Sequence, residues 1–104
     1  MTKNERKEHS DILYKTILSL ESVEECKRFF QDLCTVAELK AMEQRFEVAL
    51  LLDEGMIYKD ILERTGASSA TISRVNRALH YGSDGSQQVL PRVRPLWEAE
   101  KEGK

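Results

Sequence analysis

A basic segment without any acidic residue, from Ser68 to His80, carries the side chains with the clearest chemical potential. Arg74 and Arg77 supply guanidinium groups, and His80 can supply a third cation. Hydroxyl side chains precede the arginines, and such donors are the groups that proteins use to contact the phosphates and base edges of DNA. The segment therefore predicts a DNA-binding surface.

The charge of the whole chain is distributed unevenly along its 104 residues. The net charge is -2, but residues 1–54 contain 8 Lys or Arg against 12 Asp or Glu, whereas residues 55–104 contain 8 against 6. A nucleic-acid-binding protein usually carries a local basic footprint, whatever its total charge. The basic excess lies in the half of the chain that contains the predicted surface.

The stretch from Tyr58 to Leu79, YKDILERTGASSATISRVNRAL, fits a helix-turn-helix that would position these side chains. A short first helix would bury Ile61 and Leu62. Gly66 can adopt the positive φ that a turn between two steeply crossing helices requires. Ser68 can cap the second helix. The inward-facing stripe of that helix is then Ile72, Val75 and Leu79.

The outward face of this second helix would enter the major groove of double-stranded DNA. Small residues near its start allow a close approach to the bases, Ala70 can contact a thymine methyl group, and Arg74 can bind guanine or a phosphate. A helical hairpin whose polar face is merely solvated is the competing interpretation. The residues predicted to contact DNA are Lys59, Ser68, Ser69, Ala70, Thr71, Ser73, Arg74, Arg77 and His80.

Three further helices are expected before this motif. The spacing of apolar residues predicts one from about Lys7 to Leu20. The segments Ser22-Val23-Glu24-Glu25 and Thr35-Val36-Ala37-Glu38 have the form of capping boxes, each of which should begin a helix. The positions predicted to be buried in the second helix are Val23, Cys26, Phe29, Phe30 and Leu33. In the third helix, one apolar stripe is formed by Leu39, Met42, Phe46, Ala49 and Leu50.

The third of these helices should end at Gly55. Its last part, Val48 to Leu52, is apolar on every side. Because so short a chain offers little material to surround it, we expect a subunit interface here and therefore a homodimer. The alternative is a helix buried in the core of its own chain.

The residues after the motif, 82–104, are expected to form a linker and a partly disordered tail. Gly82 to Ser86 has the composition of a flexible turn. Leu96 and Trp97 could dock on the body of the protein or on a partner, whereas Glu98 to Lys104 should remain solvated.

Several functional classes find no support in the sequence. No stretch approaches the roughly 18 apolar residues of a membrane-spanning helix, and the first ten residues are too polar for a signal peptide, so we expect a cytoplasmic protein. Cys26 and Cys34 lack the neighbours of a zinc site. Without a catalytic set of Ser, His and Asp or a phosphate-binding loop, we expect no catalytic residue, metal or cofactor.

Two segments resemble the Trp repressor superfamily, and especially its YerC/YecD-type branch: Thr35 to Arg45 (TVAELKAMEQR), and Gly66-Ala67 followed by Ala70 to Arg74 (ATISR). The resemblance covers about residues 10–81 and implies a Trp repressor-like helical domain over residues 1–81. The implied fold is all-α, an intertwined helical homodimer with a helix-turn-helix head. Two such heads would lie about one turn of DNA apart on a pseudo-palindromic operator.

The resemblance also implies an effector pocket between the long helix and the second helix of the motif. Thr35, Arg45 and Arg74 fall where the threonine and the arginines of that pocket are expected. Val75 and Ala78 stand where tryptophan-sensing members have glycine and serine, and the added methyl groups and missing hydroxyl argue against tryptophan as a corepressor. The alternative partners of the two arginines are Glu43, Glu47 and a phosphate.

Together these patterns favour a transcriptional regulator, acting as a dimer on DNA and blocking or modulating initiation. The alternative is a helical dimer that acts as a protein-interaction adaptor without sequence-specific DNA binding. DNA binding should weaken steeply with salt, so a salt titration separates the two.

Overall fold

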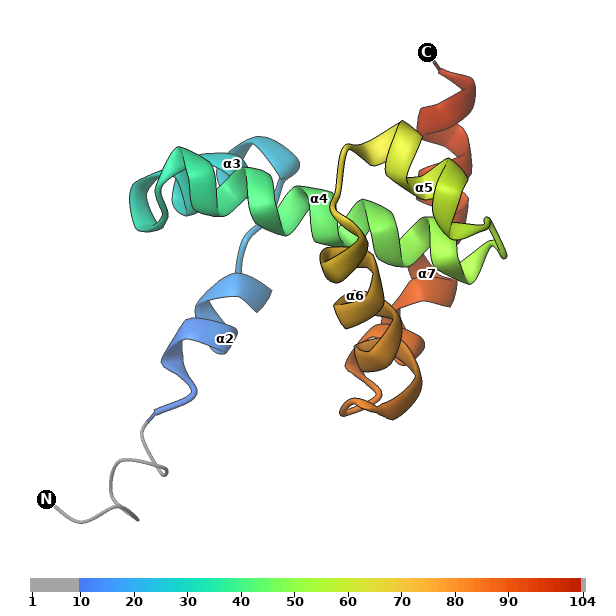
Figure 1. Ribbon diagram of the computed structural model, residues 1–104. Coiled ribbons are helices and arrows are strands. Elements are labelled where there is room, and N and C mark those ends of the chain that lie inside the picture. Colours follow the sequence, from blue (N-terminus) through green and yellow to red (C-terminus); the bar gives the residue numbers. More distant parts are fainter. Residues whose placement is uncertain (1–9, 104) are drawn as a thin grey trace, which may run out of the picture. The chain divides into compact units, whose positions relative to one another are not determined.

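The computed structural model describes residues 10–103, which form helices joined by short loops and include no strand. This confirms the predicted all-α class. None of the helices within the described range is long and apolar enough to cross a membrane. In chain order they are α2 (Ile12–Leu18), α3 (Val23–Leu33), α4 (Val36–Asp53), α5 (Tyr58–Thr65), α6 (Ser69–Tyr81) and α7 (Gly85–Glu102) (Figure 1).

Capping by side chains fixes the starts of α3 and α4, as predicted. Before α3, the Ser22 hydroxyl oxygen accepts a hydrogen bond from the Glu25 amide at 3.0 Å, and the Glu25 carboxylate accepts from the Glu21 amide at 2.7 Å. Before α4, the bonds between Thr35 and Glu38 are reciprocal, at 2.8 Å and 3.1 Å. Each pair satisfies backbone amides that a helix start leaves free.

The first helix is shorter than predicted. α2 covers Ile12–Leu18, and the predicted positions 7–9 lie outside the described residues. The helix stops before Leu20 because the Ser19 hydroxyl donates to the Thr16 carbonyl at 2.7 Å, a local bond that competes with helix continuation.

The chain divides into two compact units, residues 1–39 and 40–104, with the boundary inside α4. No described residue of the first unit is buried. The predicted burial of Val23 and Leu33 is therefore wrong for the single chain, in which they are 73% and 55% exposed. α2, α3 and one turn of α4 provide no further layer to cover this face.

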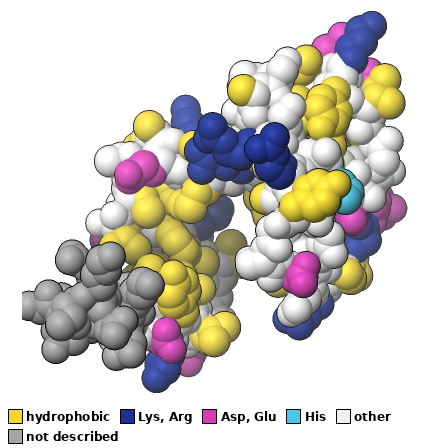
Figure 2. Space-filling view, turned by 60° about the horizontal axis from the view of Figure 1, so that its bottom comes forward, with side chains coloured by type: hydrophobic (Ala, Val, Ile, Leu, Met, Phe, Trp, Pro, Cys, Tyr) yellow, Lys and Arg dark blue, Asp and Glu magenta, His cyan; other side chains and the backbone are white. Residues whose placement is uncertain are grey.

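Large hydrophobic side chains are consequently exposed over the first unit, where they appear in yellow on the left of Figure 2. We call them the N-terminal apolar set: Ile12, Leu13, Tyr14, Leu18, Val23, Leu33 and Val36.

The second unit builds its own core around the C-terminal half of α4, where α5, α6 and α7 gather (Figure 1). Val48–Leu51 is buried here by the same chain. The alternative prediction, a helix sunk in its own core, is therefore correct for this stretch, and a subunit interface at it is wrong. The buried residues are Val48, Ala49, Leu50, Leu51, Ile61, Ala67, Ile72, Leu79 and Leu90.

Helix α7 replaces the linker and tail that were expected after residue 82. It contains Pro91 and Pro95, which lack an amide hydrogen and normally interrupt a helix. Its inner side nevertheless packs against the core of the second unit. Leu90 is 1% exposed, and Trp97 contacts both clusters of buried residues. Gly82 follows α6 at a close approach that leaves no room for a side chain: a Cβ atom there would lie 2.4 Å from the Ala78 carbonyl oxygen.

Candidate nucleic-acid interface

The turn between α5 and α6 has the geometry that the sequence predicts. Gly66 ends α5 with φ 75° and donates from its amide to the Leu62 carbonyl at 2.9 Å. Ala67 is 2% exposed and lies beneath the turn in the core. The Thr65 hydroxyl donates to the Ile61 carbonyl at 2.8 Å and accepts from the Ala67 amide at 3.1 Å. The turn is thus held by its own side chains.

A side chain of α4 fixes this turn from outside. The Gln44 amide nitrogen donates to the Thr65 carbonyl at 3.1 Å, and this hydrogen bond is partly buried. This bond satisfies a carbonyl at the end of α5 that has no helical partner. Gln44 is a positioning residue that the sequence pattern did not reveal.

Ser68 caps α6 and also orients Thr71. The Ser68 hydroxyl oxygen accepts from the Thr71 amide at 3.1 Å, and its hydrogen is directed to the Thr71 hydroxyl oxygen at 3.0 Å. Because Thr71 accepts in this pair, its own hydroxyl hydrogen remains available to an outside acceptor. The first turn of α6 contains no acidic residue to offset the positive end of the helix dipole.

The predicted DNA-contacting side chains share one property, exposure to solvent, apart from half-buried Thr71. Within residues 10–103, no salt bridge involves Lys59, Arg74 or Arg77. Their charges are therefore free of intrachain neutralisation in the described part of the chain. Lys59 lies on α5, Ser68 is the N-cap, and the rest, Ser69, Ala70, Thr71, Ser73, Arg74, Arg77 and His80, lie on α6.

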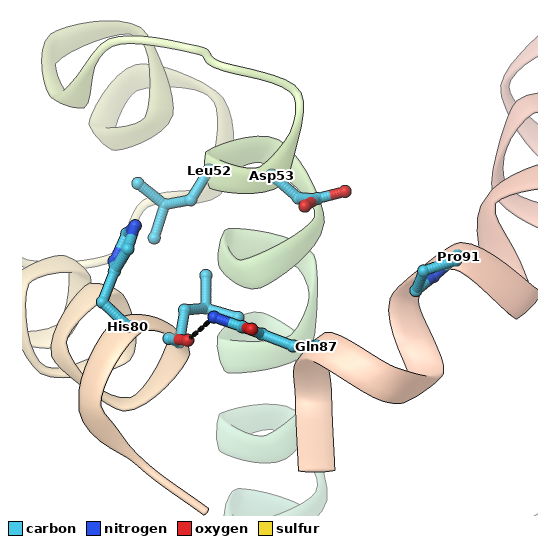
Figure 3. A pocket seen from close by; sticks show the side chains of 6 residues that line it. Leu52, Asp53, His80, Gln87 and Pro91 are labelled. Atoms are coloured by element: carbon cyan, nitrogen blue, oxygen red, sulfur yellow. Dashed lines mark hydrogen bonds between the residues drawn. The ribbon is translucent and has the colours of Figure 1, made fainter. Parts of the chain in front are cut away.

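His80 differs from the two arginines because its ring is engaged within the chain. Its Nδ1 atom lies 2.9 Å from the Asn76 carbonyl oxygen. The ring also lines a pocket of about 340 Å³ formed by the end of α4, the end of α6 and the start of α7 (Figure 3). The pocket residues are Leu52, Asp53, Leu79, His80, Gln87 and Pro91.

The residues of the implied effector pocket belong to both units. Thr35 is in the first unit, where the capping box uses its hydroxyl. The others lie in the second: Arg45, Arg74 and Ala78 are exposed, and half-buried Val75 packs against both core clusters. No salt bridge from Arg45 or Arg74 to Glu43 or Glu47 occurs among the described residues.

The cysteines and acidic residues form no metal site in the described range. Cys26 and Cys34 are half-buried free thiols. No group of three His, Cys, Asp or Glu side chains between residues 10 and 103 is arranged to hold a metal ion.

A polar cluster joins α7 to the end of α4. The Glu54 carboxylate accepts hydrogen bonds from Arg94 at 2.9 Å, Trp97 Nε1 at 2.7 Å and Lys101 at 3.0 Å. Arg94 also pairs with Asp53. Partial burial acts to raise the pKa of Glu54, but the bonds from Lys101 and Trp97 and the charges of Lys101 and Arg94 outweigh it and lower the pKa.

The sequence contained a signal for this cluster. Leu90, Arg94, Trp97 and Lys101 follow the spacing of one helical face. Pro91 and Pro95 obscured it, because a proline is normally taken to end a helix.

Comparisons with known proteins give consistent results. The Trp repressor protein family matches residues 8–94, beyond the expected domain end at residue 81. The uncharacterized protein YerC of Bacillus subtilis (strain 168) is 54% identical over 84 residues, 81% of each chain. A candidate Trp repressor from Staphylococcus aureus, with 42% identity, superposes with a TM-score of 0.80 over 89% of this chain and 96% of that one. A TrpR-like protein from Eubacterium eligens ATCC 27750, with 47% identity, also gives 0.80, over 88% and 95%.

Proposed function

The chain belongs to the Trp repressor protein family, in its YerC-type branch, and on this premise we propose that it is a transcriptional regulator that inserts α6 into the major groove of operator DNA. The family is a regulatory DNA-binding family and not an enzyme family. We therefore assign α6 the role of recognition helix.

One observation carries the proposal: the solvent face of α6 bears Arg74 and Arg77 without an acidic neighbour on that helix. Small side chains at its start, Ser69 and Ala70, allow the backbone to approach the groove. The positive end of the helix dipole and the free Thr71 hydroxyl hydrogen both favour an anionic partner such as a phosphate.

A homodimer is the form in which we expect the protein to bind. The N-terminal apolar set leaves hydrophobic side chains in water, and a second copy would cover them. Twofold symmetry would then present two copies of α6 to half-sites about one helical turn apart on a pseudo-palindromic operator. The same exposed set supports the alternative function, a protein-interaction adaptor.

We propose that tryptophan is not the effector. The Val75 side chain occupies space between the two core clusters, and Ala78 offers no hydroxyl group. A ligand that needs the room of a glycine there would have to displace a packed side chain, which is unfavourable. Calorimetry with L-tryptophan tests this expectation, and micromolar binding would contradict it.

DNA binding is tested with Arg74→Ala/Arg77→Ala, which removes two exposed cations from α6. Arg28→Ala/Arg92→Ala is the matched control, because it removes the same charge from exposed arginines on α3 and α7. Gel-shift titrations at several salt concentrations should show weaker binding only for the α6 variant. Its slope of log affinity against log salt should be shallower by about one for each phosphate that the variant no longer neutralises.

The two functions give different results in this experiment. If the wild type binds genomic fragments no better than the α6 variant at low salt, the regulator proposal fails and the adaptor remains. If both double variants weaken binding equally, general charge rather than the face of α6 is responsible, and the assignment of α6 fails.

A further inference from the structure

We propose that the pocket at the end of α6 is a ligand site for a small organic cation, one with a guanidinium or primary ammonium head and a short apolar body. The pocket has a volume of about 340 Å³, at the small end of the range of ligand sites. It is distinct from the implied effector pocket, because its lining shares none of those residues.

His80 presents a hydrogen-bond acceptor to the ligand. Its Nδ1 lies 2.9 Å from the Asn76 carbonyl oxygen, which can only accept. Nδ1 must therefore carry the hydrogen, and in the neutral ring Nε2 is left as an acceptor. Figure 3 shows the ring beside Leu52, at the wall of the pocket.

Gln87 also offers an acceptor. Its amide nitrogen donates to the Leu79 carbonyl oxygen, the bond drawn as a dashed line in Figure 3. The amide oxygen of Gln87 accepts no hydrogen bond from residues 10–103, so it can accept one from a ligand. At Asp53, one carboxylate oxygen accepts from Arg94, and the other accepts no hydrogen bond from the described part of the chain.

The local charge favours a cation. Asp53 is the carboxylate among the pocket residues, and it shares the Arg94 guanidinium with Glu54 and Glu98. Among the described residues its charge is therefore only partly neutralised. A guanidinium or ammonium head would supply both a further positive charge and the N–H donors that the acceptors need.

The remaining walls accommodate an apolar body. Leu52, Leu79 and Pro91 bring hydrocarbon from α4, α6 and α7 to the same pocket. A few methylene groups of the ligand could pack against them, and their removal from water would add affinity.

The ligand would act on the recognition helix, a step that rests on the proposed function. Leu79 and His80 belong to α6, which also carries Arg74 and Arg77. A ligand that bridges the end of α6 to α4 and α7 would favour one placement of that helix. It can change DNA affinity only if it binds that placement better than others, and DNA would then change the affinity for the ligand by the same factor.

The site is tested first by binding to the full chain, with butylguanidinium chloride as the probe and butylurea as its neutral analogue of similar shape. In nuclear magnetic resonance titrations, butylguanidinium should shift the backbone amides of residues 52–53, 79–82 and 87–90. Butylurea should bind at least about tenfold more weakly, because it lacks the charge. Shifts that are absent or spread over the surface, or equal binding of the two compounds, would overturn the proposal.

Variants then locate the binding. Asp53→Asn removes the carboxylate from the pocket, and Glu98→Gln is its matched control because Glu98 also contacts Arg94 but does not line the pocket. We expect Asp53→Asn to weaken probe binding at least about fivefold and Glu98→Gln less than about twofold. Equal weakening would mean that the effect passes through Arg94, which contradicts a ligand contact by Asp53. Thermal unfolding of both variants verifies that they are folded.

The regulatory step has its own measurement. At matched ionic strength, saturating butylguanidinium should change the dissociation constant for an operator fragment at least about fivefold. No change would refute the regulatory step. If the chain binds the probe but no DNA, the proposed function fails while the ligand site is supported.

Discussion

The two units of the chain differ in whether they bury their hydrophobic side chains. In residues 40–103, α4 to α7 bury a core, and Ile61 and Ile72 are 0% exposed. In residues 10–39 no side chain is buried, and Leu18 is 86% exposed. Side-chain caps begin α3 and α4 in the first unit and α6 in the second, so local helix signals do not explain the difference. The second unit has helices on several sides of α4, whereas the first has no further layer.

This difference separates the part of the chain that supports the proposed DNA-binding head from the part that would form the proposed dimer. The turn at Gly66, the cap at Ser68 and the core beneath α6 all lie within the second unit, so one chain can hold the head in place. The N-terminal apolar set has no cover within the described residues of the first unit. We therefore expect substitutions in the second unit to change folding, and substitutions in the first unit to change association.

The largest effect is expected from Ile72→Ala. Ile72 is 0% exposed on the inner face of α6, and truncation of a buried Ile side chain to Ala typically costs about 2–5 kcal/mol of unfolding free energy. Ile57→Ala is the matched control, because Ile57 lies in the same unit but is 62% exposed. Urea denaturation followed by circular dichroism measures both. A similar loss for the two variants would show that the second unit has no core of its own.

A smaller effect, on association, is expected from Ile12→Gln. Ile12 and Ile57 are the same residue type with nearly the same exposure, 64% and 62%, but in different units. If a second copy covers the first unit, Ile12→Gln should raise the dimer dissociation constant at least about tenfold, because two side chains are affected per dimer. Ile57→Gln should leave it unchanged.

Sedimentation equilibrium at several protein concentrations distinguishes these outcomes. A wild type that remains monomeric at micromolar concentration would contradict the dimer. Equal weakening by Ile12→Gln and Ile57→Gln would place the interface elsewhere.

Local features of the fold were predictable because each depends on a few neighbouring residues. Ser22 and Thr35 predict the start of a helix, and Gly66 predicts the turn. Each prediction depends only on hydrogen bonds and backbone conformation within a few neighbouring residues. Burial was less predictable, because it depends on what covers a helix. Val48–Leu51 is covered in part by α7, a helix whose two prolines conceal its periodicity.

The candidate site likewise has features that the sequence predicts and features that it does not. Helical spacing was enough to place Arg74 and Arg77 on the outer face of α6, where the structure also has them exposed. It could not show the Gln44 bond to the turn, which joins residues far apart in the chain. It also could not show the pocket at His80, because part of that pocket comes from α7.

The smallest effect is expected from Glu54→Gln, which tests whether the polar cluster holds α7 against the rest of the second unit. Glu54, whose side chain is 24% exposed, accepts hydrogen bonds from Arg94, Trp97 and Lys101, and Glu54→Gln should cost about 1 kcal/mol at neutral pH. The pKa of Glu54 lies below its ordinary 4.5 in the folded chain, so its contribution is present above that value. It is lost as the pH falls through the lower folded pKa. The difference between wild type and variant should therefore shrink in acid.

Urea titrations at neutral pH and below about pH 4 measure this change. The control is Glu63→Gln, which changes an exposed side chain of α5. Glu63→Gln should have little effect at either pH, because surface charges contribute little to stability. A Glu54 variant as stable as the wild type at neutral pH would mean that the polar cluster does not hold α7 in place. α7 would then be held by the packing of apolar side chains such as Leu90 and Trp97, without a contribution from the cluster.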